Sequence, residues 1–359
     1  MGIKKGSVTF SRFEVVTDLP ANFADEFDGQ IRKGAFRDFF PENEEKIMGW
    51  VGLQKICDRE FAYANHTVGD YRVFSLRIDK KTVPGSLLRM QASEIERARI
   101  EELGIKRLPK SEREAIKDSV RTRLLLQAPA VPSLVDVCWN LSTSVVYVST
   151  LSDKVLQEFQ NCFMDTFGLN LILLEPWLPE LAGKPDAISC PGREFLTWLW
   201  FKSEDNEGTV TVGDGTPIGV EFGKRIAFES GTGGDIDAES VVCQGRSVGT
   251  PFEGYGALRR GKKIREAQIT ISDPTAEWSF GLRADKFQYQ VVKLPTVGDG
   301  TARNAPDDVA EEGALLERIF LLELLVGRVD ELLTVFLKLR MSDGWGQEQT
   351  RVSVWLGQV

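Results

Sequence analysis

A long polar segment between two strand-like runs constrains the fold of this chain more than any other feature. From Pro84 to about Leu126 the residues are highly charged and helical in spacing, with a break near Gly104–Pro109. Tyr71–Ile78 before this segment and Leu134–Trp139 after it alternate apolar and polar residues, as strands do. We therefore expect an α+β protein with mixed or antiparallel sheets and a long charged helix.

The rest of the chain fits the same class. Ser111 and Glu114 form a capping-box pattern, which predicts that a second helix begins after the break. Asp308–Arg340 predicts a C-terminal amphipathic helix, and Arg351–Leu356 predicts a short edge strand. The aromatic run Phe195–Phe201 is expected to pack in a core rather than to stack on bases.

Five segments follow from these patterns. They are an N-terminal α/β lobe, the charged helical region, a β-hairpin, helix and strand unit with an aromatic helix, a glycine-rich β region, and a C-terminal helix with its tail (residues 1–80, 81–132, 133–205, 206–300 and 301–359).

Several classes of protein are disfavoured by composition. No apolar run approaches the roughly 18 residues of a membrane span. The five cysteines are scattered without CxxC spacing, which favours reduced thiols, mostly in cores, and a cytoplasmic location. With a single histidine, His66, a zinc site is not expected, so we predict neither a metal nor another cofactor.

The charged segment carries the strongest candidate site. Between Arg89 and Arg123 there are ten basic and seven acidic residues, a net +3 in a chain whose net charge is −9. Four of the basic residues recur at helical spacing and should share one face: Lys110, Arg113, Lys117 and Arg121. Such a stripe can follow DNA phosphates, although a solvated helix with internal ion pairs has the same pattern.

A second basic cluster lies in the glycine-rich region. It is expected to form a flexible loop that meets a polyanion, and its members are Arg259, Arg260, Lys262, Lys263 and Arg265. The stretch Gly256–Lys263 is a near miss to the phosphate loop GxxxxGK[ST], because Lys263 stands where a hydroxyl would hold Mg²⁺. Ile264–Ser272 also reads as a strand where that motif needs a helix.

No catalytic constellation stands out. His66 lies in a polar, turn-like stretch and is expected at the surface or at a cap. The acid pairs Asp235/Asp237 and Asp307/Asp308 fall in loop-like sequence, where acids are common for other reasons. We therefore predict that the protein is not an enzyme.

An ordered series of motifs resembles the recombination-associated protein family RdgC. The series begins with Met48–Val51 (MGWV) and Lys81–Pro84, and continues with Lys110–Val120, which is similar to the family's K-x-E-K-x-x-L-K-D-E-V. Leu124–Leu126, the strand around Trp139, Leu169–Pro176 and Glu194–Leu199 follow in the same order. The resemblance covers about residues 45–200 and fades beyond Glu204.

The resemblance implies a function. RdgC proteins form ring-shaped homodimers that surround duplex DNA without reading its sequence and compete with RecA, and the matched basic positions here are Lys110 and Lys117. A basic and phenylalanine-containing stretch of the family is replaced here by Gln127–Pro132, which leaves ring closure open. The preference for duplex or single-stranded DNA and a direct contact with RecA also stay open. The alternatives are a protein-interaction factor on the same fold and a metal-dependent nuclease or nucleotide hydrolase.

Overall fold

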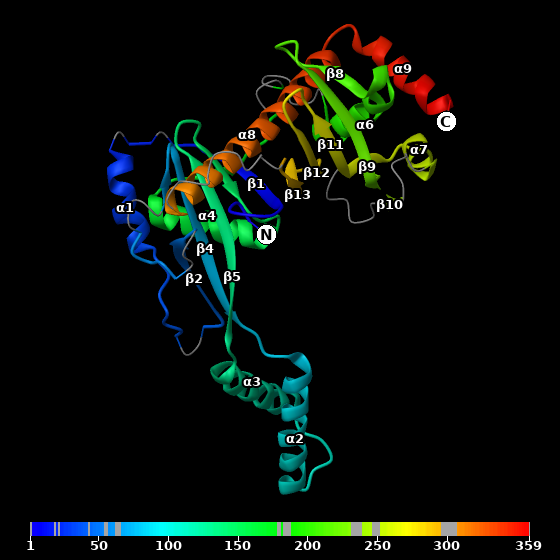
Figure 1. Ribbon diagram of the computed structural model, residues 1–359. Coiled ribbons are helices and arrows are strands. Elements are labelled where there is room, and N and C mark those ends of the chain that lie inside the picture. The colour runs from blue at the N-terminus through cyan, green and yellow to red at the C-terminus, as the bar shows by residue number, and fades with distance from the viewer. Residues whose placement is uncertain are drawn as a thin grey trace.

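One sheet of 13 strands runs through the described part of the chain (Figure 1). The computed structural model describes residues 2–17, 19–20, 22–41, 44–53, 57–61, 66–177, 181, 188–230, 239–245, 252–295 and 307–358. The strand order is β10-β9-β11-β12-β13-β1-β6-β5-β4-β2, with β3, β7 and β8 pairing beside β4, β1 and β9. Together with the helices described below, these antiparallel strands confirm the predicted α+β class.

The strands are β1 Val8–Val15, β2 Lys46–Gly52, β3 Thr67–Val68, β4 Tyr71–Lys81, β5 Ala130–Asn140, β6 Val145–Val148, β7 Leu171–Leu173, β8 Thr209–Thr211, β9 Pro217–Glu229, β10 Ser240–Gln244, β11 Lys263–Ser272, β12 Glu277–Arg283 and β13 Gln288–Lys293. The helices are α1 Phe23–Lys33, α2 Gly85–Leu103, α3 Lys110–Gln127, α4 Asp153–Phe167, α6 Pro191–Glu204, α7 Phe252–Arg259, α8 Asp307–Arg340 and α9 Trp345–Gln358, with the 3₁₀ turn η2 at Asn206–Gly208.

Strand β1 joins two halves of the sheet. Val8 and Phe10 pair with β13, whereas the following residues 11–14 pair with β6. The structure divides residues 133–205 between these halves, because β5, β6, α4 and β7 lie with the N-terminal strands and α6 packs on β9 and β11.

Aromatic residues fill the core of the N-terminal half. Phe23 and Phe27 on α1 and Phe163 and Phe167 on α4 are spaced by four, so each pair lies on one face of its helix. All four contact or surround the buried ring of Trp139 on β5. These helices therefore cover one face of the sheet largely with aromatic rings, beside the aliphatic Ile31 and Leu156.

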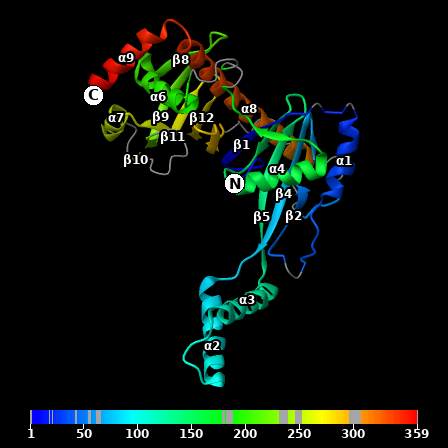
Figure 2. The same cartoon turned by 180° about the vertical axis from the view of Figure 1, so that it is seen from behind.

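The C-terminal half has a second core under α6 and α8. Phe195, Trp198, Trp200 and Phe201 are all buried, which confirms that the aromatic run is structural. Helix α8 confirms the predicted long helix, and it crosses both halves (Figure 2). Trp278 of β12 donates to the Leu321 carbonyl at 3.1 Å, and the hydroxyl of Tyr71 in β4 donates to Glu323 at 2.5 Å.

Three expectations were wrong in this part of the structure. Residues 351–356 belong to helix α9 instead of a strand, because Val352, Trp355 and Leu356 lie on one helical face that packs against the C-terminal core. Helix α3 begins at Lys110 and so confirms the predicted second helix, but Pro109 is its N-cap and no side chain caps it, so the capping box does not form. The cysteines are not mostly in cores, because Cys138 and Cys243 are buried, whereas Cys57 is exposed and Cys162 and Cys190 are half-buried.

Among the described helices, none combines the length and apolarity that a membrane span requires.

Candidate nucleic-acid interface

Helices α2 and α3 form an arm that stands clear of the sheet (Figure 1). They are inserted at the tip of the β4–β5 hairpin, where Lys81 pairs with Ala130. Gly104 ends α2 in the left-handed conformation, with φ of 63°, and Pro109 precedes α3, so the chain turns back at the predicted break. The arm buries few side chains (Ala92, Leu108, Val120 and Leu124), and most of its charged residues face water.

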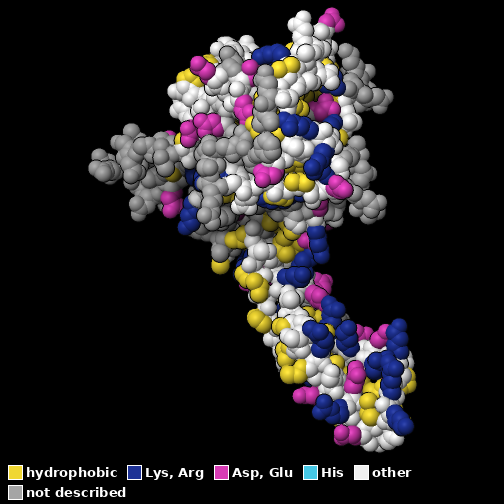
Figure 3. All heavy atoms as spheres, turned by 90° about the vertical axis from the view of Figure 1, so that its right-hand side faces the viewer, with side chains coloured by type: hydrophobic (Ala, Val, Ile, Leu, Met, Phe, Trp, Pro, Cys, Tyr) yellow, Lys and Arg dark blue, Asp and Glu magenta, His cyan; other side chains and the backbone are white. Residues whose placement is uncertain are grey.

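The predicted basic stripe lies on one side of α3. Lys110, Lys117 and Arg121 are exposed and Arg113 is half-buried, and the four share the flank of the helix beside its contact with α2. Figure 3 shows Lys and Arg side chains along one side of the arm and up to the body, with apolar side chains along the other side of its upper part.

Acidic neighbours hold the stripe only weakly. Lys110 Nζ lies 3.8 Å from Glu114, and Arg121 Nη2 lies 2.7 Å from Glu45 of the body. Lys117 makes no ion pair with any described residue, and Arg113 Nε is buried without a hydrogen-bond partner there. Since exposed ion pairs contribute only about 0–1 kcal/mol, these cations stay available to a phosphate.

Other cations of the arm extend this surface. Arg97, Lys106 and Arg107 are exposed and make no ion pair within the described chain, whereas Arg99 is held by Glu102 and Glu112. The alternative of a self-neutralised helix therefore describes Arg99 and the loose pair of Lys110 with Glu114, but not the cations of the arm that have no ion pair in the described chain.

The second basic cluster is not the flexible loop that the sequence suggested. Arg259 ends α7, Gly261 turns the chain with φ of 80°, and Lys263 begins β11. The strand predicted at Ile264–Ser272 is confirmed, so a helix does not follow the near-miss phosphate loop.

Most cations of this second cluster are held by acids or carbonyls of neighbouring elements. Lys262 is only 6% exposed and donates to Glu239 at 2.9 Å, which lowers the pKa of that carboxyl. Lys263 Nζ donates to Glu194 at 2.9 Å, and Arg259 Nε donates to the Leu356 carbonyl at 2.8 Å. Arg260 is exposed and has no ion-pair partner among the described residues.

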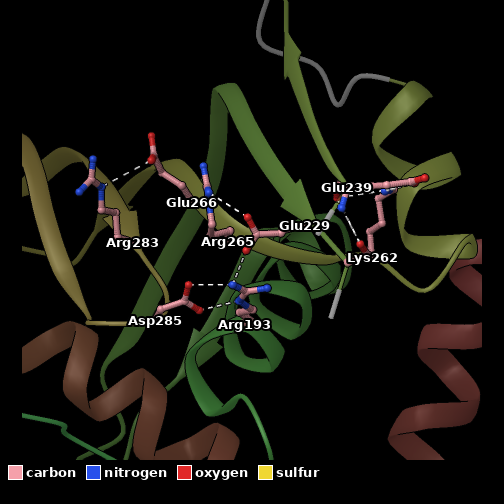
Figure 4. A network of polar contacts seen from close by, with 9 residues as sticks. Arg193, Glu229, Glu239, Lys262, Arg265, Glu266, Arg283 and Asp285 are labelled. Carbon is pink, nitrogen blue, oxygen red and sulfur yellow. Dashed lines mark hydrogen bonds and ion pairs between the residues drawn. The ribbon is translucent and has the colours of Figure 1, made fainter. Parts of the chain in front are cut away.

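Arg265 belongs to a larger ion-pair network around a buried arginine (Figure 4). Arg193 of α6 is 1% exposed and makes a two-pronged contact with Asp285, at 2.5 and 2.8 Å, and a third bond of 2.6 Å to Glu229. The hydrogen bonds that Arg193 donates to Asp285 and Glu229 outweigh the effect of burial and raise its pKa. Arg265 joins Glu229 at 2.9 Å. The network thus ties α6 to the ends of strands β9 and β12.

Sequence reasoning missed the cations that strand alternation gathers on the sheet. Arg225, Arg283 and Lys293 lie on β9, β12 and β13, which belong to one run of four adjacent strands, β9-β11-β12-β13. The available signal was the period-two pattern of β11 and β12, which assigns faces but not strand order.

The residues considered for catalysis are placed differently from the expectation. His66 is completely buried rather than at the surface, and its Nε2 lies 2.7 Å from Asp28 Oδ1, which satisfies a polar group inside the N-terminal core. Asp307 and Asp308 begin α8 rather than lie in a loop, whereas Asp235 and Asp237 lie outside the described residues. Within the described chain, no three His, Cys, Asp or Glu side chains come together as metal ligands.

Comparison with known proteins bears on the first half of the chain. No curated protein matches it. Residues 11–177 match the model of a family described as "Putative exonuclease, RdgC". The matched range contains the second part of β1, strands β2 to β7, the whole arm and the motifs from Met48 to Pro176. The motif Glu194–Leu199 lies beyond it. Over residues 11–177, which hold the arm and its basic stripe, the chain is therefore similar to the RdgC family.

Proposed function

We propose that this protein binds DNA through its phosphates, without reading the base sequence, and thereby modulates RecA-type recombination at the nucleoid. The observation that carries the proposal is the stripe of Lys110, Arg113, Lys117 and Arg121 on an arm that projects from the body. Exposed lysine and arginine side chains on a convex helix meet phosphates before they meet base edges, and phosphate contacts carry no sequence information directly.

The acidic net charge is compatible with this function. A net charge of −9 describes the whole surface, whereas binding depends on the local potential along the arm. Each phosphate that a cation neutralises releases counterions, so the logarithm of affinity should fall with the logarithm of salt by about 0.9 for each contact.

A homodimer is the assembly that we infer, and it would coat or encircle a duplex. Its support is the apolar side of the arm and its stalk, where Leu126, Val131 and Leu134 are 55%, 63% and 40% exposed. Apolar side chains clustered at one solvent-facing site favour a protein contact there. They lie at and beside Gln127–Pro132, so a second copy would meet this chain through aliphatic residues.

We also propose that the protein acts without catalysis, although the matched family's description mentions an exonuclease. A metal-dependent nuclease binds its metal ions through carboxylates. Here Glu229, at the end of β9, and Asp285, just after β12, are instead paired with Arg193 and Arg265. Incubation of labelled DNA with Mg²⁺ or Mn²⁺ tests this part, and cleavage would overturn it.

DNA binding is tested by titration of two labelled duplexes of unrelated sequence across a range of salt. We expect equal affinities and a slope near −3.6 if all four stripe cations contact phosphates. The variant Lys110→Glu/Lys117→Glu should reduce the slope by about 2. Arg123→Glu is the matched control, because Arg123 lies on the opposite flank of α3, where it bonds to Gln91 of α2.

The rival function is a protein-interaction factor on the same fold. It predicts no binding to either duplex even at low salt, and equal behaviour of the stripe variant and its control. That result would move the search for a partner from nucleic acid to protein.

A further inference from the structure

The sheet presents an unusual open face in its C-terminal half. Helices α6, α7 and α8 cover one face, where Ile264, Ala267 and Leu282 are buried. The other face is built from β9, β11, β12 and β13, and its side chains are small or amidic and half-buried: Gly219, Gly223, Gln268, Thr270, Ser279, Gly281 and Gln290.

Glycines on this face leave room for the side chains of the neighbouring strands. A Cβ on Gly223 would lie 2.9 Å from Gln268 Cγ, and one on Gly281 would lie 3.2 Å from Gln290 Cβ. Glycine at these positions lets both amides lie across the strands. Glycine within strands often marks a place where another backbone approaches closely, and serine, threonine and glutamine side chains commonly bond to phosphate and sugar.

A groove lined with cations follows the same face. Two hollows of about 340 and 230 Å³ meet at Glu266, which lines both. The cations along them come from four sheet strands and the β12–β13 turn: Arg225, Arg265, Arg283, Lys286 and Lys293. The larger hollow is also lined by Asp153, which pairs with Lys286, and by Asp285, which pairs with the buried Arg193. A polar floor with cations along it fits a polyanion better than an apolar ligand.

Glu266 lines both hollows and pairs with two of these cations, Arg225 and Arg283. Figure 4 shows its contact with Arg283. Its carboxylate lies 2.9 Å from Arg225 and 3.6 Å from Arg283, and it is 12% exposed while the two arginines are 47% and 43% exposed. Glu229 differs, because it contacts the buried Arg193 and supports α6. The pairs of Glu266 therefore lie at the surface and have no such packing role.

We propose that this open face receives the phosphate backbone of DNA, and that Glu266 occupies the place of a phosphate between Arg225 and Arg283 in the free protein. The inference rests on the proposed function and adds to it a second contact surface, where the Glu266 carboxylate competes with a DNA phosphate for the two arginines. A DNA phosphate that displaces Glu266 gains the two guanidinium groups, and the carboxylate turns toward solvent.

The exchange is physically accessible. Exposed ion pairs contribute little to stability, so releasing the two arginines from Glu266 is not prohibitive. Each new phosphate contact releases counterions, which favours the exchange at low salt and disfavours it at high salt. Glu266 thus keeps DNA binding weaker and less sensitive to salt than the number of arginines suggests.

The test compares Glu266→Gln with Glu221→Gln in the full chain. Glu221 is exposed on β9 of the same sheet and pairs in register with Thr270, and it makes no ion pair in the described structure. Both variants remove one negative charge, but only Glu266→Gln frees arginines. With a labelled duplex, we expect Glu266→Gln to bind about fivefold to tenfold more tightly at 0.1 M salt and to steepen the salt slope by about 0.9.

Further variants separate the possible outcomes. Arg225→Gln/Arg283→Gln should weaken binding and abolish the gain from Glu266→Gln, and thermal unfolding checks that each variant is folded. Equal affinities for Glu266→Gln and Glu221→Gln would overturn the inference while leaving the proposed function intact. If the wild-type protein binds no DNA at low salt, the proposed function itself fails, and this is a separate result.

Discussion

At the scale of single residues, Gly49 shows why the MGWV motif requires glycine. A Cβ at this position would lie 2.4 Å from Cα and 2.6 Å from N of Phe36, which are backbone atoms and cannot turn aside. The Phe36 amide is fixed there because it donates to the Trp50 carbonyl at 2.9 Å. The motif therefore needs glycine because the backbones of β2 and of the segment after α1 lie in close contact there.

We expect Gly49→Ala to destabilise the protein by about 2 kcal/mol, since overpacking against a fixed backbone typically costs 1–3 kcal/mol. Gly29→Ala is the matched control, because Gly29 lies in α1 with open space around its missing Cβ. The control should gain up to about 1 kcal/mol from helix propensity. Urea unfolding followed by tryptophan fluorescence measures both, and equal midpoints would contradict the steric explanation.

The sequence predicts residues well where the signal is local. The stripe on α3 follows from helical spacing alone, so its four members could be named in advance. The ion-pair partners could not be named in advance, because they are distant in the sequence. Arg121 pairs with Glu45, 76 positions away, and Lys262 pairs with Glu239, 23 positions away. His66 was misplaced for the same reason, since its partner Asp28 lies on another element.

At the scale of elements, the arm is an insertion that the body does not need. Lys81 and Ala130 already form a cross-strand pair, so a two-residue Asn-Gly turn can replace residues 82–129. We expect the shortened protein to fold, because the buried residues of the arm pack between α2 and α3. Its DNA affinity should fall at least tenfold, with a slope smaller by about 3–4.

Circular dichroism and the salt titration measure the two consequences separately. A shortened protein that is folded and binds DNA as before would place the interface away from the arm. A protein that no longer folds would show that the exposed contact of Arg121 with Glu45 contributes far more than the roughly 0–1 kcal/mol of such pairs.

Helix α9 is held by a carboxylate whose ionisation can be followed. Glu348 is 5% exposed and accepts bonds from Trp198 at 3.0 Å and Lys202 at 2.6 Å. Burial opposes its charge, but Lys202, Trp198 and Arg351 together lower its pKa below the ordinary 4.5. Because the folded pKa is depressed, this stabilisation is present above pH 4.5 and is lost as the pH falls through the folded value.

We expect acid to loosen α9 before the sheet unfolds, with a change in the fluorescence of Trp345 and Trp355. Glu348→Gln should lower stability at pH 7 by about 2 kcal/mol and remove this early acid step, because a glutamine keeps the bond to Trp198 but not the charge. Glu312→Gln, an exposed carboxylate on α8, is the control. An unchanged acid profile in Glu348→Gln would disprove the assignment.

The two C-terminal predictions show that periodicity identifies a long helix more reliably than a short element. Asp308–Arg340 was recognisable because its helical period lasts for more than 30 residues, whereas Arg351–Leu356 has six residues that fit either period. The choice was made by tertiary contacts, since Trp355 Nε1 donates to Glu204 at 2.8 Å and its ring packs against Trp200 and Tyr255.

At the scale of the whole molecule, α8 couples the two halves of the sheet. Arg12 of β1 is 3% exposed and makes bonds of 2.6 and 3.0 Å to Asp330, between the rings of Phe287 and Tyr289. Burial opposes the charge on Arg12, but Asp330 keeps its pKa above the ordinary value. Neither the pairing of β1 with both halves nor this bridge is visible in local sequence patterns.

Asp330→Ala should therefore uncouple the halves as well as destabilise them. It leaves a buried guanidinium unpaired, at a cost of about 3 kcal/mol after allowing for the partial exposure of Asp330. Hydrogen exchange of β5 and β11 peptides should report one common opening free energy in the wild type and two in the variant. Arg12→Met/Asp330→Leu should recover much of the loss, because apolar residues of similar volume can replace a buried ion pair. If exchange in Asp330→Ala still gives one common value, then the continuous hydrogen bonding through β1, rather than α8, makes the sheet a single cooperative unit.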